Sequence, residues 1–328
     1  MQAEHAEPAE KPRDLTDMSL EDLLNEDIVP INVLASHTHL KNEFMVGYRY
    51  MFMEMGHNQE GTRDVSVQEV LQTYPVAHSR MESQMHMVDL MYAPSDWVTV
   101  MTMVPYKMNY MHHVLRTGPG PSDYTSGIGD VTFMSSFNVV GDPHGHGQRL
   151  VINAGFTAPT GSIDEAEGGR RFEYPMQLGS GTWDLLPGLT YLGHSAAWAW
   201  GAQALFTVRL GENENHYRLG HVYRLSAWTQ FEVLDWFGPS ARLDWHGWGN
   251  IQGADPELDP NRNPAFDPNK QAGERLDFLM GLNFYVPGGP LKGTRFSLEG
   301  GVPLYQNILG PNLAVDWMIT AGLSYSFR

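Results

Sequence analysis

The chain has 328 residues, with 21 lysines and arginines against 38 aspartates and glutamates, giving a formal net charge of -17 at pH 7. This charge would repel a polyanion and therefore argues against nucleic-acid binding. The sequence holds no cysteine, which excludes disulfides, thiolate metal sites and cysteine nucleophiles. It contains no run of 18 or more apolar residues, so it predicts no transmembrane helix.

Residues 1–40 form the first predicted unit, an N-terminal segment in the periplasm. The stretch LTDMSLEDLLNEDI opens with capping and acidic residues and places Leu20, Leu23, Leu24 and Ile28 at helical spacing. We expect a short amphipathic helix there, which could engage a periplasmic partner. The opening residues MQAEHAEPAEKPRD lack the apolar core of a signal peptide, so we expect the sequence to represent the protein after export.

Alternation with a period of two residues dominates the chain from residue 43 onward. In the last such stretch, Val315, Trp317 and Ile319 oppose Asp316 and Thr320. Twelve segments share the pattern, roughly residues 43–55, 81–92, 97–112, 127–140, 149–158, 182–192, 197–210, 217–234, 239–249, 274–286, 294–304 and 314–327. Their lengths fit the roughly 9 to 11 residues that a tilted strand needs to cross a bilayer. We therefore predict an all-β fold, an antiparallel barrel of about 12 strands over residues 41–328.

The connections between these segments favour a barrel in the bacterial outer membrane over a soluble β-sandwich. Short connections such as APSD and PGGPLKG alternate with mostly longer ones, the longest being 56–80, 114–126, 159–181 and 250–273. Short periplasmic turns and longer outer loops are typical of outer-membrane barrels, and an even strand number would leave both termini in the periplasm. Aromatic residues near the segment ends would contact lipid and lipopolysaccharide at the interfaces: Tyr92, Trp97, Trp183, Trp198, Trp317 and Tyr325.

Several stretches resemble one bacterial outer-membrane family. They are MYAPSDWVTVMTMVPY, APTGS, YPMQLGSGTWDLLPGLTYLG, NIQGADP and the closing LYQNILGPNLAVDWMITAGLSYSF, and together they cover nearly all of residues 40–328. The family is the transporter-like one named for the meta-pathway of phenol degradation. The resemblance implies an exported barrel that moves small solutes, and it says little about which solute.

Methionine is concentrated in the first part of the predicted barrel. Of 18 methionines, 12 lie between positions 45 and 111, and eleven of these fall on the polar face of their strand. Neighbouring antiparallel strands would bring such side chains within roughly 5 Å of one another along the lumen. The predicted lumenal ligands, including two histidines near strand ends, are Met45, Met51, Met53, Met55, His57, Met81, Met85, Met87, Met91, Met101, Met103, Met111 and His113.

Two kinds of solute fit a lumen lined by methionine side chains. Thioethers are soft ligands that select Cu(I), and by the same logic Ag(I), and several weak ligands in series would let an ion bind and leave. Methionine also fills irregular interiors and tolerates apolar partners, which suits small aromatic or hydrophobic compounds. We therefore expect a channel or transporter for small solutes whose methionine-rich lumen binds or passes Cu(I), with passive uptake of small aromatic or hydrophobic compounds as the alternative. Neither requires a resident cofactor.

Other candidate chemistry is weaker. The predicted outer loop GADPELDPNRNPAFDPN carries Asp255, Asp259 and Asp267, which could hold Ca²⁺ but lack the fixed ligand pattern of a calcium loop. A lipid hydrolase would need a serine and a histidine within hydrogen-bond reach. The adjacent pair His194 and Ser195 would point to opposite sides of an extended chain, so we do not expect an enzyme.

Overall fold

A computed structural model describes residues 33–35, 37–142, 147–195 and 197–327. The helix expected within residues 15–28 lies outside these described residues. Within them, no helix is both long enough and apolar enough to span a membrane.

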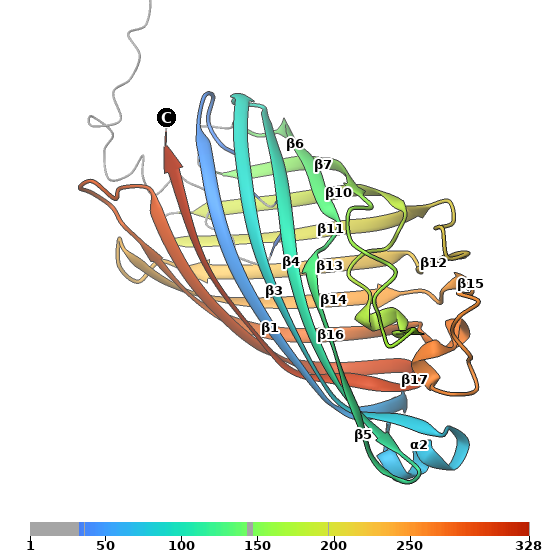
Figure 1. Ribbon diagram of the computed structural model, residues 1–328. Helices are drawn as coiled ribbons and strands as arrows, with labels where there is room; N and C mark the ends of the chain where they lie inside the picture. The colour runs from blue at the N-terminus through green and yellow to red at the C-terminus, as the bar shows by residue number, and fades with distance from the viewer. Residues whose placement is uncertain (1–32, 36, 143–146, 196, 328) are drawn as a thin grey trace, which may run out of the picture.

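The described chain is an antiparallel β-barrel, as the alternation predicts (Figure 1). Each long strand pairs with its neighbour along the barrel, and β17 pairs with β1 to close the ring. The strands of the ring are β1 (Phe44–Gly61), β3 (Val76–Ser95), β4 (Val98–Leu115), β6 (Val131–Val140), β7 (Gln148–Ala158), β10 (Trp183–Ser195), β11 (Trp198–Leu210), β13 (Val222–Phe231), β14 (Phe237–Trp248), β16 (Gly273–Tyr285) and β17 (Thr294–Phe327).

The 34-residue element β17 doubles back on itself and so occupies two positions in the ring. Its first part pairs with β16 up to Ile308, and the rest pairs with β1. The two parts meet where the Ser326 amide donates to the Gly293 carbonyl at 3.1 Å and where the Gln306 side chain bonds to the backbone of Val315. The eleven labelled elements of the ring therefore supply the predicted twelve strands.

The structure corrects the expected strand limits near the first two long connections. The expected loop 56–80 is largely strand, because β1 runs to Gly61 and β3 begins at Val76, with only β2 (Arg63–Val65) and α2 (Val67–Thr73) between them. The loop expected at 114–126 is also mostly strand, since β5 (Gly118–Ile128) pairs with the second half of β4. The strand expected at 127–140 begins at Val131 as β6, which pairs with the first half of β4. Hydrogen-bonded pairing continues past the apolar belt, and alternation alone does not mark where the bilayer ends.

The two faces of the wall differ as a membrane barrel requires. Apolar side chains such as Tyr48, Leu225 and Leu323 lie exposed on the outside, whereas polar side chains such as Asn153 and Asp244 are buried inside. Tyrosine and tryptophan near the strand ends are also exposed on the outer surface. An outward apolar belt around a polar interior can lie in lipid because every strand edge of the ring is paired.

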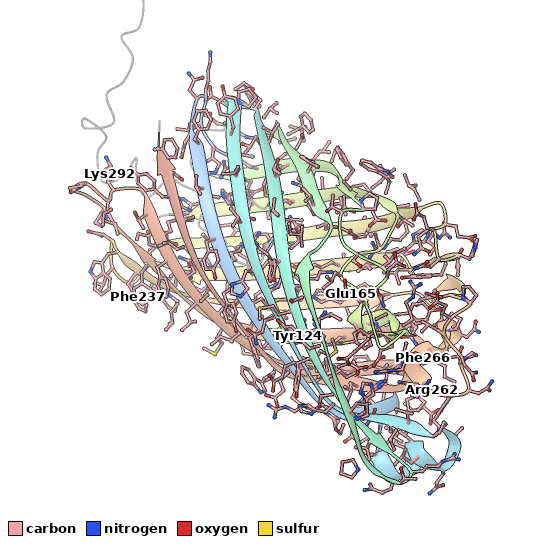
Figure 2. All side chains as sticks on the ribbon, viewed as in Figure 1. Tyr124, Glu165, Phe237, Arg262, Phe266 and Lys292 are labelled. Atoms are coloured by element: carbon pink, nitrogen blue, oxygen red, sulfur yellow. The ribbon has the colours of Figure 1, made fainter. Side chains whose placement is uncertain are left out.

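We call the end where β1 begins and β17 finishes the terminal end, and the opposite end the loop end. In Figure 2, Lys292 marks the terminal end and Arg262 the loop end. The loop end carries the short elements of the longer connections: β8 (Ala166–Glu167), β9 (Arg170–Arg171), η2 (Tyr174–Met176), β12 (Tyr217–Arg218), β15 (Gln252–Gly253), η3 (Pro264–Phe266) and η4 (Pro268–Lys270).

Candidate functional site: the lumen and its two ends

The predicted methionines form two rows across neighbouring strands. Near the terminal end, the strand registers place Met45 opposite Met91, Met91 opposite Met101, and Met101 opposite Met134. All four side chains are buried in one apolar cluster, which Leu186 and the partly buried Met103 join. Side chains of directly opposed residues are in contact range, so the alternation correctly placed these thioethers on the lumenal face.

A second row lies near the loop end. Met55 stands opposite Met81, which stands opposite Met111. These residues pack with Met176 of the loop that follows β7, a contact that the sequence pattern did not indicate. On the other side of β1, Met53 stands opposite Met318 of β17 and packs with it. Methionines from outside the predicted set thus complete both rows.

Charged groups separate the two rows at mid-barrel. Arg49 and Asp89 form a buried, two-point ion pair, with 2.7 Å from Nη2 to Oδ1 and 3.1 Å from Nε to Oδ2. The same Nη2 lies 3.3 Å from the sulfur of Met103. Met87 stands opposite Arg49, and Met85 stands between Met51 and Lys107 in the register. The sulfur-lined wall is therefore two apolar patches joined through an ionic band.

The two predicted histidines have separate surroundings. The ring of His57 is half-exposed and lies 2.6 Å from Asp316, through its Nδ1 and the carboxylate Oδ1. His113 is buried beside His78, with Nε2 2.9 Å from Oε1 of Glu173. Of the two, only His113 belongs to a cluster of potential metal ligands.

The opposite wall of the lumen carries paired charges. Arg242 of β14 binds Glu299 of β17 through two contacts, at 2.5 and 3.1 Å, and Asp244 at 2.6 Å. Asp244 also accepts from Arg224 of β13 at 2.6 Å. Charged groups taken out of bulk water need such partners, and these ion pairs supply them between β13 and β14 and across β16 to β17.

The terminal end of the lumen is occupied by the segment that precedes β1. Val33 and Ala35 are buried against the inner wall in two apolar clusters. The Leu34 carbonyl accepts from Gln203 Nε2 at 2.9 Å, and the Ala35 carbonyl accepts from Asn153 Nδ2 at 2.9 Å. The described end of the predicted unit 1–40 therefore reaches into the lumen.

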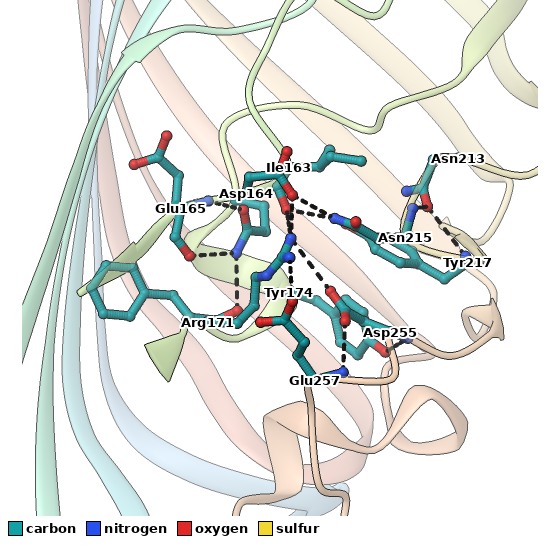
Figure 3. Close-up of polar contacts among 12 residues, drawn as sticks. Ile163, Asp164, Glu165, Arg171, Tyr174, Asn213, Asn215, Tyr217, Asp255 and Glu257 are labelled. Carbon is teal, nitrogen blue, oxygen red and sulfur yellow. Dashed lines mark hydrogen bonds and ion pairs between the residues drawn. The ribbon is translucent and has the colours of Figure 1, made fainter. Parts of the chain in front are cut away.

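Three connections meet at the loop end around Arg171 and Asp164 (Figure 3). The Arg171 guanidinium pairs with Asp164 of its own loop, and its Nη2 lies 3.0 Å from Glu257 Oε1 and its Nη1 3.7 Å from Asp255 Oδ2. Asn215, from the connection between β11 and β13, donates to Asp164 at 3.0 Å. This hydrogen bond, together with pairing to Arg171, lowers the pKa of Asp164 below its ordinary value.

Aromatic packing beneath these contacts strengthens the closure. Tyr174 and Tyr217 meet edge to face at 4.9 Å and are buried with Ile251, Leu258 and Phe266. The Tyr174 hydroxyl accepts from the Asp255 amide at 3.1 Å. No motif in the sequence links these three loops, so the closure follows from their positions around one barrel mouth.

The three aspartates considered for Ca²⁺ each serve a different turn. Asp255 Oδ1 accepts from the Glu257 amide at 2.9 Å, Asp259 Oδ1 from Asn261 at 3.0 Å and Asp267 Oδ1 from Asn269 at 2.9 Å. Such contacts are the usual local use of aspartate in turns. In the part of the chain that the structure describes, the cluster that could hold a metal through three His or carboxylate groups contains none of them.

The apolar belt, the closed ring and the lined lumen together define an integral outer-membrane β-barrel with the fold of a channel. The crystal structure of the COG4313 outer membrane channel from Pseudomonas putida F1 matches with a TM-score of 0.63 at 13% identity, covering 90% of this chain and 100% of that one. The KdgM porin (TM-score 0.40, 9% identity, 87% and 99% covered) and the CymD monoaromatic hydrocarbon channel (0.40, 8%, 88% and 90%) match less well. No curated protein matches the sequence.

A family model also matches residues 86–305, more than half of the chain. The protein belongs to that family, described as the putative MetA-pathway of phenol degradation. The resemblance seen in the sequence is thereby confirmed.

Proposed function

We propose that the protein is a passive outer-membrane channel for small, uncharged, apolar or aromatic solutes. One observation carries this proposal: the methionine rows are packed as apolar surface, with Leu186 and Leu205 in the same cluster as Met45, Met91 and Met101. Thioethers are flexible and polarizable, and they make favourable contacts with aromatic rings of varied shape. The family description, which refers to phenol degradation, agrees with such a cargo.

The route proposed runs along the methionine-bearing wall formed by β1, β3 and β4. On that wall, Arg49 and Asp89 pair with each other, and the Lys107 ammonium donates to the Leu178 carbonyl at 2.8 Å. The apolar patches on either side remain available to a neutral solute. We place the loop end outside the cell and both termini in the periplasm, because longer loops of such barrels face outward. The N-terminal segment and the closed loops would then control access from the two sides.

No catalytic activity is part of this proposal. In the strand register, His194 stands opposite Ala199 and Ser195 opposite Trp198, at neighbouring positions of β10. Neighbouring residues of a strand project to opposite faces, so this pair is not arranged as a nucleophile and its base.

The test is initial uptake of a radiolabelled monoaromatic compound by a porin-deficient Gram-negative strain that expresses the protein. The lipopolysaccharide leaflet slows apolar solutes, so a channel should raise the uptake rate. Met85→Trp would fill the middle of the lumen and should return uptake to that of cells without the protein. Met280→Trp, at a methionine 64% exposed on the outer face, should leave it unchanged. Equal uptake with and without the wild-type protein would reject the proposal.

A second candidate cargo is Cu(I), or Ag(I), favoured by the two rows of opposed methionines. Thioether ligands select these soft ions over hard cations. The detergent-solubilised protein would be titrated with Cu(I) against a competing chelator, beside a variant with Met81, Met91, Met101 and Met111 changed to leucine, which breaks both rows. Binding no tighter than that of the variant would remove this candidate. Aromatic uptake should survive these four substitutions, because leucine keeps the wall apolar.

A further inference from the structure

Two β-bulges bring a pair of histidines together at the loop end of the lumen. The register of β3 and β4 shifts between His78 and Arg80, and that of β4 and β5 shifts between His112 and Val114. His78 and His113 stand directly opposite each other, with ring centroids 5.0 Å apart, and both are buried. Bulges re-aim side chains that regular alternation would place elsewhere, and they often occur at functional sites.

Glu173 completes the cluster from the loop that follows β7. Its Oε1 lies 3.1 Å from His78 Nε2 and 2.9 Å from His113 Nε2, and its side chain is 0% exposed. The ligand atoms of the three residues all lie within 4.8 Å of one another. The second oxygen, Oε2, is buried without a hydrogen-bond partner among the described residues. A buried carboxylate oxygen left in this state is costly unless a cation meets it.

When both imidazoles are neutral, the surrounding hydrogen bonds leave neither ring with an N–H that points at Glu173. His113 Nδ1 lies 3.2 Å from the Pro121 carbonyl, so that nitrogen must donate and Nε2 must carry the lone pair. The Asn263 amide is oriented by its oxygen, which accepts from the Ala265 amide at 2.9 Å. Its Nδ2 therefore faces His78 Nε2, at 2.8 Å, as a donor. The lone pair of His113 Nε2 is then directed at the carboxylate, which is itself an acceptor. The single lone pair of His78 Nε2 accepts from Asn263, a hydrogen bond that a bound ion would replace.

We propose that His78, His113 and Glu173 bind a divalent first-row transition ion, with zinc as the foremost candidate. Two imidazole nitrogens and one carboxylate are a common zinc set, and a water would take the fourth position. Tetrahedral zinc with bonds of about 2.0–2.2 Å holds its ligand atoms roughly 3.3–3.6 Å apart. Glu173 Oε1 lies 3.1 and 2.9 Å from the two imidazole nitrogens, so small shifts would admit the ion. Magnesium and calcium prefer all-oxygen sets and are not expected.

The shell around the cluster has the features of a metal site. A histidine that binds a metal through one nitrogen commonly donates its other N–H to a backbone carbonyl, as His113 does to Pro121. Asp123 Oδ2 lies 3.9 Å from His113 Nε2 and is held by Arg170. Apolar side chains, among them Met111 and Phe172, pack next to the strands and loop that supply the ligands and limit access of water.

The ion would tie the loop that carries Glu173 to the barrel wall formed by β3 and β4. Asn263 connects the same centre to the long connection between β14 and β16. This inference concerns a bound structural ion and does not depend on the identity of the transported solute.

The test uses the purified full-length protein in detergent, loaded with Zn²⁺, dialysed and analysed for metal per chain. The wild type should retain one zinc per chain, and Co²⁺ should give the intense visible absorption of a four-coordinate site. His113→Gln and Glu173→Gln should weaken binding by at least about 100-fold, since loss of even an outer-shell partner costs about 10- to 100-fold. His112→Gln is the matched control, because the neighbouring His112 contacts Ser122 instead.

Failure of the wild type to retain zinc, or equal retention by all four proteins, would overturn the site. If His113→Gln does not fold, as judged by loss of heat-modifiable migration, X-ray absorption of the zinc-loaded wild type decides the question. Two imidazole nitrogens with oxygen ligands support the site. A first shell of sulfur, or of oxygen alone, overturns it.

Discussion

Loosening the N-terminal segment from the lumen should open the terminal end of the channel. Gln203 and Asn153 each donate one hydrogen bond, at 2.9 Å, to the carbonyls of Leu34 and Ala35. The double substitution Gln203→Ala and Asn153→Ala removes both, while Ser136 still donates to Ala35 at 3.3 Å. A net hydrogen bond contributes about 1 kcal/mol. Losing both bonds removes about 2 kcal/mol from the binding of the segment inside the lumen. Because 1.4 kcal/mol corresponds to a factor of ten, the equilibrium between the segment bound in the lumen and the segment released from it shifts about 30-fold.

The assay is single-channel recording in planar bilayers. The double variant should show about a 30-fold larger ratio of open to closed time, the value that the shifted equilibrium gives. Gln230→Ala is the matched control, because Gln230 is a buried lumenal glutamine whose amide donates to Tyr285. Wild-type gating in the double variant, with the control also unchanged, would refute the idea that this segment closes the terminal end.

Four further predictions concern the N-terminal segment, the barrel and its loop end. Deleting residues 1–36 should leave a folded, heat-modifiable barrel with raised conductance, because ring closure rests on β1 and β17; loss of folding would show that the segment is needed for assembly. Arg171→Ala should raise the open probability by freeing the loops that Arg171 pairs, and unchanged recordings would contradict this. The folded-state pKa of Asp164 is lowered, so the contribution of Asp164 to the loop contacts is present above the ordinary value of 3.8 and is lost as pH falls through the folded-state pKa. Channels should therefore open more often in acid. Gating that does not change with pH down to that range would count against this role of Asp164. Arg242→Met removes the buried guanidinium that pairs with Asp244 and Glu299, and it should destabilise the barrel by about 3–5 kcal/mol, seen as a lower temperature of heat modification. Arg63→Met, at an exposed arginine, should change this temperature little.

Local sequence determined most of the barrel. Side chains alternate faces along a strand, so apolar and polar residues at alternate positions assign lipid and lumen directly, as Tyr48 and Arg49 illustrate. The same periodicity placed Met45, Met91 and Met101 on the lumenal face of neighbouring strands, where the registers do oppose them. The strand count also followed, since each strand produces its own pattern.

Only the tertiary structure decided what the lumen contains. The bulge beside His78 breaks the alternation, so no periodicity placed that ring next to His113. Glu173 contacts both rings although it is 95 residues from His78 and 60 residues from His113 in the sequence. It reaches them through a loop whose path no local sequence pattern predicts. Residues 33–35 likewise carry no signal that they lie inside the barrel. Local pattern fixes the face of each strand, whereas the position of loops and termini depends on contacts that form only after the ring closes.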